Sequence, residues 1–314
     1  MISYYYRIIF LIVDVLIVVL ISIAFLTLLE RKILGYIQLR KGPNKVGIVG
    51  LLQPFSDGLK LFTKEFFIIL KSNYLYYLIS PIIIIFLILI YWIFIPYYVN
   101  FLNRNIQILI IICLIRVAVF PLIVSGWSSN SFYATLGRFR RVAQTISYEV
   151  SISFVFFSVI VLSERFNLYD YIRYQFYSWN IITLFPAGII LFISLLAEIH
   201  RTPFDFSEGE SELVSGFNVE YIRGPFAVFF IAEYGIILFI IYLFRLLFLG
   251  GNIYSIVFYF NFIIIVILVI WIRGTLPRAR YDEIIYIIWK RFLGRILLYI
   301  VFIVRIYIII RLLL

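Results

Sequence analysis

Acidic side chains are concentrated in one part of this chain. Seven of the sixteen Asp and Glu residues lie between positions 198 and 233. Four of them fall close together, with spacings of three and four that would set like charges against each other in a helix: Asp205, Glu208, Glu210 and Glu212. Coupled carboxylates raise one another's pKa values and titrate as a group, so such a cluster could hold and pass protons near neutral pH. A solvated acidic loop paired with arginines is the alternative.

Two further carboxylates interrupt long apolar stretches. Glu149 lies roughly 10 Å inside the run 142–162, at the helical rise of 1.5 Å per residue, and Gln144 and Ser151 add a polar stripe beside it. Glu233 lies at a similar depth in the run 225–249, next to Tyr234. Ionisable groups so far inside a membrane are costly and usually mark a path for ions or protons. A structural ion pair with an intramembrane arginine is the alternative.

These carboxylates must be positioned by membrane helices. Of the 314 residues 64% are hydrophobic and only 14% are charged, which excludes a water-soluble globular fold. Eight apolar runs approach the length of about 20 residues that a spanning helix needs. We therefore predict an all-α, polytopic membrane protein that forms a single integral membrane domain over 1–314. The runs are 8–29, 76–98, 106–126, 142–162, 181–199, 225–249, 253–272 and 288–312.

Several kinds of redox and metal chemistry are excluded for the chain alone. Cys113 is the only cysteine and His200 the only histidine, so no disulfide, four-cysteine iron–sulfur cluster, tetrahedral zinc site or bis-histidine haem can form. No glycine-rich dinucleotide or phosphate loop is present either. We expect no bound cofactor and no metal, and any electrons must be carried by another subunit.

The basic residues indicate which loops share a side of the membrane. The net charge is +11, but sixteen Lys and Arg residues lie in the odd-numbered loops against three in the even-numbered ones. This bias places the odd loops in a matrix or a cytoplasm, and it argues against nucleic-acid binding. In the first loop, Leu51, Phe55, Leu59 and Phe62 recur at helical spacing. They predict an amphipathic helix along the membrane surface, either as part of a docking surface or as a simple anchor.

Two classes of function remain open from the residues alone. One is a secondary transporter with a carboxylate relay, and the other is a coupling subunit of a larger redox pump. A transporter of this kind usually shows paired halves with interrupted helices at matching positions, and the chain shows neither. The long charged loops on one side instead favour a docking surface for a soluble partner.

Several ordered motifs then carry a specific resemblance. The chain resembles the family of subunit 1 of mitochondrial NADH:ubiquinone oxidoreductase, respiratory complex I, with the arthropod versions most similar. The motifs extend over essentially the whole chain: ERKILGY at 30–36, RKGPNKVG at 40–47, QPFSDGLKLFTKE at 53–65, AQTISYEV at 143–150, the stretch from RTPFDF at 201–206 to FNVEY at 217–221, and RGTLPR at 273–278.

The resemblance implies a function and assigns roles to residues. The family subunit anchors the peripheral arm on the membrane arm, and forms much of the ubiquinone tunnel and the first part of an acidic proton path. Other complex I subunits hold FMN and the iron–sulfur clusters, and the location is the mitochondrial inner membrane. A related membrane-bound hydrogenase or transporter subunit is the alternative. The implied tunnel residues are Glu30, Arg31, Arg40, Asp57 and Phe217. The implied proton-path residues are Glu149, Glu198, Asp205, Glu208, Glu210 and Glu233, with Arg201 and Arg280 as charge partners.

The chain also departs from the family pattern. His200 stands where the family usually has Asn. Met1 is the only methionine, and arginines occupy positions where the family tends to have small residues: Arg116, Arg138, Arg141 and Arg223. Arg116 would lie inside the third span with no obvious acidic partner. Both oddities follow if AUA and AGA codons of an arthropod mitochondrial gene are read as Ile and Arg rather than as Met and Ser.

Overall fold

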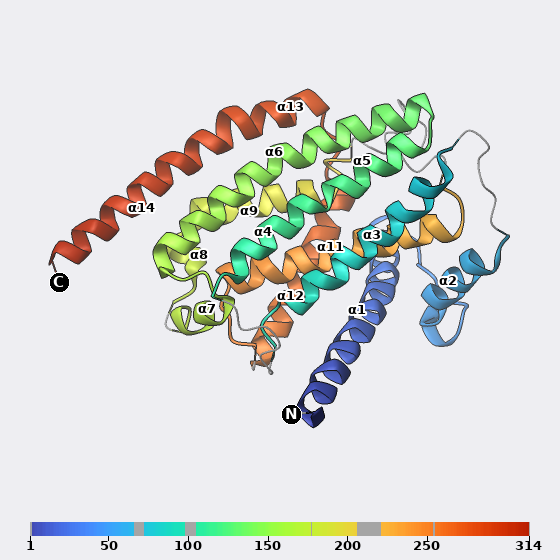
Figure 1. Ribbon diagram of the computed structural model, residues 1–314, viewed down its shortest axis with the longest axis horizontal. Helices are drawn as coiled ribbons and strands as arrows, with labels where there is room; N and C mark the ends of the chain where they lie inside the picture. The colour runs from blue at the N-terminus through green and yellow to red at the C-terminus, as the bar shows by residue number, and fades with distance from the viewer. Residues whose placement is uncertain are drawn as a thin grey trace.

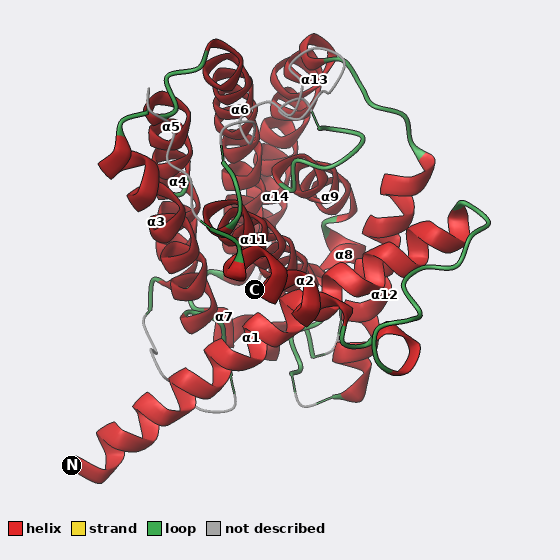
Figure 2. Cartoon of the chain, turned by 90° about the vertical axis from the view of Figure 1, so that its right-hand side faces the viewer, coloured by secondary structure: helices red, strands yellow, loops and turns green. Residues whose placement is uncertain are grey.

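The fold is helical throughout the part of the chain that the computed structural model describes (Figures 1 and 2). The described residues are 2–65, 72–97, 105–176, 178–205, 221–253 and 255–313, and they contain no strand. Seven segments are long and apolar enough to cross a membrane, which confirms the all-α, polytopic prediction. They are Ile9–Ile37, Tyr74–Ile93, Gln107–Ser128, Phe132–Ser163, Gly224–Phe248, Ile256–Thr275 and Tyr281–Ile309.

The helices that form these segments have clear boundaries. Segment one is most of α1 (Ile2–Ile37), the second is α3 (Tyr74–Ile93), and the fourth is α6 (Phe132–Ser163). The fifth and sixth are α11 (Gly224–Phe248) and α12 (Ile256–Thr275). The last consists of α13 (Tyr281–Tyr286), the π-helical turn η3 (Ile287–Phe292) and α14 (Leu293–Leu313). Short elements connect them: η1 (Ile48–Gly50) and α7 (Leu168–Tyr174).

The predicted span 181–199 differs from the other seven. It is divided at Leu184 into α8 (Asn180–Thr183) and α9 (Phe185–Glu198). The 14 residues of α9 rise about 21 Å, which is less than the apolar thickness of a bilayer. Pro186 accounts for the late start of α9, because a proline is tolerated in the first turn of a helix and not in its interior. The described residues therefore hold seven segments of spanning length and one shorter apolar helix, which agrees with the prediction of about eight membrane helices.

Proline also explains the break in the third span. The span consists of α4 (Gln107–Val117) and α5 (Val119–Ser128), which meet at Ala118. Pro121 lacks a backbone N–H, and its ring crowds the carbonyl of Val117 four residues earlier. The helix is interrupted there, close to the residues that line the first cavity described below.

Several helices continue beyond their apolar runs, and this brings charged residues onto them. α1 extends to Ile37 and so carries Glu30 and Arg31. α6 starts at Phe132, ten residues before the apolar run 142–162, and carries Arg138 and Arg141 as buried residues. Residues that the sequence suggested for loops are therefore held on rigid helices.

The amphipathic helix predicted in the first loop is present as α2 (Gln53–Thr63). Pro54 stands in its first turn, as is common at helix starts. Leu59 and Phe62 are exposed, while the Phe55 ring lies 6.0 Å from the ring of Phe25 on α1. The apolar face of α2 therefore adjoins the membrane-spanning part of α1.

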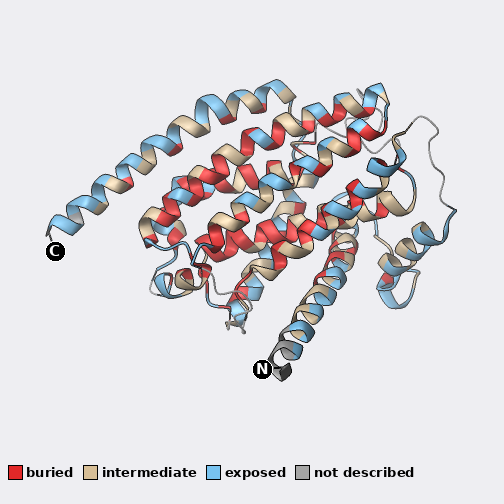
Figure 3. Cartoon of the chain, viewed as in Figure 1, coloured by how far each residue is buried: buried red, intermediate tan, exposed pale blue. Residues whose placement is uncertain are grey.

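Burial is concentrated in the centre of the helix assembly. Figure 3 shows buried residues gathered on α6, α9 and α11, whereas α14 and α2 are largely exposed. The exposed side chains of α14 include Leu298, Val301 and Phe302, which suit contact with lipid tails. Charged groups on the three central helices therefore face protein, and there the candidate site lies.

Candidate functional site

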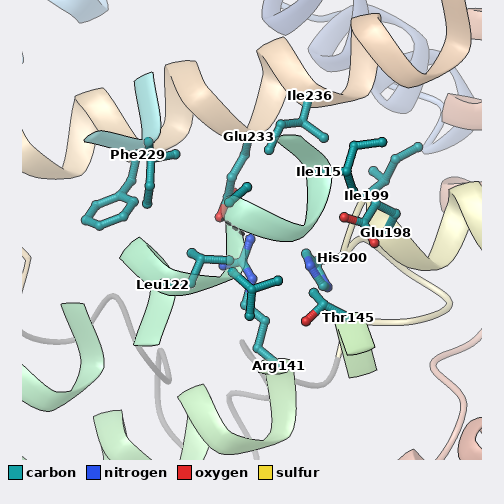
Figure 4. A pocket seen from close by; sticks show the side chains of 13 residues that line it. Ile115, Leu122, Arg141, Thr145, Glu198, Ile199, His200, Phe229, Glu233 and Ile236 are labelled. Carbon is teal, nitrogen blue, oxygen red and sulfur yellow. Dashed lines mark hydrogen bonds and ion pairs between the residues drawn. The ribbon is translucent and has the colours of Figure 1, made fainter. Parts of the chain in front are cut away.

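A first cavity of about 540 Å³ lies between α5, α6, α11 and the end of α9 (Figure 4). Apolar side chains such as Ile115, Leu122 and Phe229 form most of its wall. Five polar side chains face it from three elements: Arg141 and Thr145 from α6, Glu198 and His200 from the end of α9 and the loop after it, and Glu233 from α11. The fold thus joins two of the predicted proton-path carboxylates, Glu198 and Glu233, in one enclosed space.

Glu233 is held by two arginines. Its Oε1 accepts a hydrogen bond from Arg141 Nη2 at 2.9 Å, and its Oε2 lies 3.6 Å from Arg201 Nη2. All three side chains are largely buried. Arg201 also stacks over aromatic rings of α11, with its guanidinium carbon 5.3 Å from the ring centre of Tyr234. Glu233 is thus a largely buried carboxylate that lies between two guanidinium groups.

Gln144 fixes the end of α9 against α6. Its Nε2 donates to the carbonyl oxygen of Ala197 at 3.2 Å and to that of Phe204 at 2.9 Å. One carbonyl lies in the last turn of α9 and the other in the loop after it, where the regular hydrogen bonds of the helix stop. Because Gln144 satisfies them, Glu198 and His200 are held facing α6. The backbone turns at His200, whose φ of 52° is left-handed.

A second cavity of about 430 Å³ lies between α1, α9, α11 and α12. Glu30 is its buried acid, only 7% exposed. The hydroxyl of Tyr234 donates to Glu30 Oε2, and Arg273 of α12 forms an ion pair with Glu30 Oε1. The remaining wall is mainly aliphatic, with side chains from all four helices. The cavity therefore has one compact polar end and a long apolar surface.

The two cavities share a wall. Glu233 lines the first and Tyr234, the next residue on α11, lines the second. Ile199 lines both, and Arg201 lines the second while its guanidinium is paired with Glu233 of the first. Only a few side chains therefore lie between Glu30 and Glu233, so a change of charge beside Glu30 occurs close to Glu233.

The loop after α9 is joined to the segment between α12 and α13. Asp205 is buried and lies 3.5 Å from Arg278 Nη2. The backbone N–H of Ala279 donates to the carbonyl of Pro203 at 2.9 Å, and the Thr202 hydroxyl donates to the carbonyl of Arg273 at 3.0 Å. Arg280 is exposed just before α13, so Arg278 is the arginine that contacts Asp205.

Glu149 lines a separate, small pocket beside the first cavity, and Ile115 lines both. Glu149 is half-buried on α6 and lines this pocket of about 200 Å³ with Arg116 of α4. The sequence showed no acidic partner for Arg116, and the packing of α4 on α6 supplies one. Among the described residues, Glu149 Oε1 is buried without a hydrogen bond.

Two more of the predicted tunnel residues, Arg31 and Asp57, contact each other and do not line the second cavity. Arg31 pairs with Asp57 of α2, whose second oxygen accepts from Gln53 Nε2 at 2.8 Å. Arg40 is exposed in the turn after α1, where its Nε donates to Gln38 at 2.9 Å, and it lines neither cavity. Three predicted residues lie outside the described part of the chain: Glu208, Glu210 and Phe217.

Sequence reasoning did not select four residues that build the site: Gln144, Tyr234, Arg273 and Arg278. The motifs that contain them were visible, since Arg273 and Arg278 bound the RGTLPR stretch and Tyr234 follows Glu233. Their partners were not, because Tyr234 and Glu30 are 204 residues apart. Among the described residues no group of three or more His, Cys, Asp or Glu side chains could hold a metal ion.

Comparison with known proteins places the chain in a family. Residues 10–304 match the family described as NADH dehydrogenase. The chain belongs to the NADH dehydrogenase family. Among curated relatives it is 55% identical to NADH-ubiquinone oxidoreductase chain 1 of Aedes aegypti over 90% of this chain and 91% of that protein. The protein of the same name from Anopheles gambiae is 53% identical over 91% of each chain, and that from Locusta migratoria 50% identical over 88% of each. The two cavities are thus features of an NADH dehydrogenase family protein with arthropod relatives.

Proposed function

We propose that this chain is the core membrane subunit of the proton-pumping NADH:ubiquinone oxidoreductase that forms the ubiquinone tunnel, begins the acidic proton path and docks the peripheral arm. Relatives at 50–55% identity carry the name NADH-ubiquinone oxidoreductase chain 1. The observation that carries the proposal is the wall shared by the two cavities, where Glu233 and Tyr234 are consecutive residues. One cavity suits a quinone and the other suits protons.

The second cavity is the candidate end of the tunnel. A ubiquinone has a polar ring with two carbonyls and a long apolar tail. The aliphatic walls suit the tail, while Glu30, Tyr234 and Arg273 offer one charged and polar end. Arg31, Arg40, Asp57 and Phe217 belong to the entrance in this proposal. The exposed Arg31–Asp57 pair would guide the polar ring from the membrane surface.

The first cavity is the candidate start of the proton path. Reduction of a quinone takes two electrons and two protons, and it changes the charge that Glu30 and Tyr234 experience. Arg201 lines the second cavity and also pairs with Glu233, so a shift of its guanidinium toward the quinone would weaken the pair. Glu233 would then have one cationic neighbour fewer, and this change would couple the quinone to the first acid of the path.

The path would continue through the other acids. Glu198 faces Glu233 across the first cavity, and Asp205 is tied to Arg278 in the loop after α9. Glu149 lies one helical turn beyond Thr145 on the same face of α6, toward α4. Glu208 and Glu210 extend the path along the sequence, with Arg201 and Arg280 as balancing charges.

Partners would supply the electrons. The chain is proposed to bind no cofactor, whereas FMN and the iron–sulfur clusters lie in the peripheral-arm subunits. Those subunits would dock on the odd-numbered loops, which we place on the matrix side of the mitochondrial inner membrane. The neighbouring membrane-arm subunits would cover the α4–α6 face that carries Glu149.

Purification of the native complex through a tag on this chain tests the proposal. We expect FMN and iron–sulfur subunits to co-purify, and NADH oxidation by ubiquinone to acidify one side of sealed vesicles. A chain that purifies without iron and moves ions in the absence of NADH would instead be a secondary transporter. If quinone reduction is retained without any proton movement, the proton path is wrong and the rest of the proposal stands.

A further inference from the structure

His200 is the only histidine in the chain, and it faces the first cavity. The residue is 8% exposed. In the view of Figure 4 its imidazole lies between the carboxylate of Glu198 and the guanidinium of Arg141, which is bonded to Glu233. Among the described residues Nδ1 of this ring is buried and has no hydrogen-bond partner. A buried polar atom of this kind usually has a partner, which marks this ring nitrogen as a place where a proton can bind.

The backbone holds the ring in this place. His200 has a φ of 52°, and its N–H donates to the carbonyl of Ala197 at 3.3 Å, in the last turn of α9. Gln144 binds that same carbonyl from α6. The left-handed conformation turns the side chain out of the helix direction and into the cavity. Asn and His are among the residues that adopt this conformation more readily than most.

The surroundings keep the imidazole neutral. Burial lowers the pKa of His200 well below its ordinary value of 6.5, and the positive charges of Arg141 and Arg201 lower it further. Arg141 and Arg201 are the charges that act on the ring, and the other polar side chains that line the same cavity are Thr145, Glu198 and Glu233. A neutral imidazole has one nitrogen that can accept a proton and one that can donate a proton. A protonated ring has two N–H groups and no nitrogen that can accept.

We propose that His200 is a proton relay between Glu198 and Glu233. The inference rests on the proposed proton path and adds a residue to it. A proton leaves the carboxyl group of Glu198 and binds the unprotonated nitrogen of the ring, while the N–H on the other nitrogen gives its proton toward Glu233. Glu198 ends as a carboxylate, Glu233 as a carboxylic acid, and the ring is neutral again with its two nitrogens exchanged. Rotation of the ring restores the starting state.

Two substitutions distinguish a relay from a residue that only fills space. His200→Gln keeps much of the size and the hydrogen bonding but cannot pass a proton. His200→Asn is smaller, suits the left-handed backbone, and leaves room for a water that can carry the proton instead. If His200 is a relay, the Gln variant loses coupled turnover by about 100-fold or more, as expected for a lost acid–base group, while the Asn variant keeps at least about half. If it only fills space, the order is reversed, because Gln fills the cavity better.

The measurement is NADH:ubiquinone turnover with proton yield, in the assembled complex in sealed membranes. Each rate is normalised to NADH oxidation by an artificial acceptor, so that a loss of assembly is not counted. A second readout is the pH profile: protonation of the ring at low pH should slow the unmodified enzyme, and the Asn variant should lack that acid limb. An equal acid limb in both, or a Gln variant as fast as the unmodified enzyme, would overturn the relay.

Glu198→Gln separates failure of the relay from failure of the proposed function. If Glu198→Gln is slow while the two His200 variants show the reversed order, the proton path stands and His200 has no part in it. If Glu198→Gln retains full turnover and full proton yield, the path through the first cavity is itself wrong.

Discussion

Glu233 and Tyr234 are consecutive residues of α11, yet their side chains belong to two different cavities. Glu233 pairs with Arg141 and Arg201 beside Glu198, whereas Tyr234 donates to Glu30 beside Arg273. Neighbouring positions on a helix point about 100° apart, so one helix turn can form the wall between two chambers. Any movement of α11 at this turn would therefore change both cavities at once.

The hydrogen bond from Tyr234 to Glu30 should matter for quinone chemistry. Tyr234→Phe removes only the hydroxyl, and a hydrogen bond to a charged group contributes about 1.5–3 kcal/mol. We expect quinone-dependent turnover to fall by roughly ten-fold if that interaction is used in the reaction. Tyr242→Phe, two turns further along α11 and packed among Trp92, Phe258 and Phe262, is the matched control and should leave turnover unchanged. Equal quinone-dependent turnover in the two variants would show that Tyr234 has no role in the reaction.

The Arg31–Asp57 pair should act on quinone access and not on stability. Both side chains are substantially exposed, and pairs of this kind contribute about 0–1 kcal/mol. Asp57→Asn should therefore leave assembly intact, lower quinone-dependent turnover, and spare NADH oxidation by artificial acceptors. Assembly is followed by the amount of intact complex on native gels. A parallel loss of both activities would show that the substitution disrupts the fold or the docking of partners.

The side of the membrane that each loop faces can be tested with trypsin. Arg40 and Lys41 are exposed in the first loop, and Arg165 and Arg173 are exposed in an even-numbered loop. In sealed mitoplasts, where only the outer face of the inner membrane is accessible, we expect cleavage at Arg165 or Arg173 and protection over 30–72. Opening the membrane and removing the peripheral arm should then allow cleavage at Arg40. Cleavage at Arg40 in sealed mitoplasts would reverse the topology and the docking surface with it.

Peptide masses of the natural protein should differ from the printed sequence at the unusual arginines. We predict Ser at 116, 138, 141 and 223, and Met at some of the isoleucines, if AGA and AUA codons are read by an arthropod mitochondrial code. Glu233 would then keep Arg201 as its cationic neighbour, and Glu149 would face a hydroxyl in place of Arg116. Mass spectrometry of peptides that span these positions decides the matter. Arginine found at 116 and 141 would disprove it.

The sequence predicted the helices well because long apolar runs are themselves the physical requirement for spanning a membrane. It predicted boundaries less well, since α6 continues past its apolar run to bury Arg141 and α9 starts late at Pro186. Which acid meets which partner was not predictable. Arg141 and Glu233 are 92 residues apart, and their contact depends on how α6 packs on α11. The single-domain organisation and the roles of the site residues remain predictions.

Glu149 gives the most direct test of the claim that carboxylates in this chain carry protons for quinone reduction. It is half-buried at membrane depth, and its Oε1 has no hydrogen bond among the described residues. Glu149→Gln keeps the size of the side chain and removes its titration, so the complex should assemble. A structural pair with Arg116 would instead give poor assembly, restored by also neutralising Arg116.

The measurement is coupled turnover in the assembled Glu149→Gln complex, with quinone reduction and proton yield recorded together in sealed membranes. The proton path predicts that both fall together, by about ten-fold or more, as expected when a proton-transfer group is lost. Artificial-acceptor activity should be unchanged, because the electron carriers lie in other subunits. Normal turnover with a full proton yield would show that this carboxylate carries no protons.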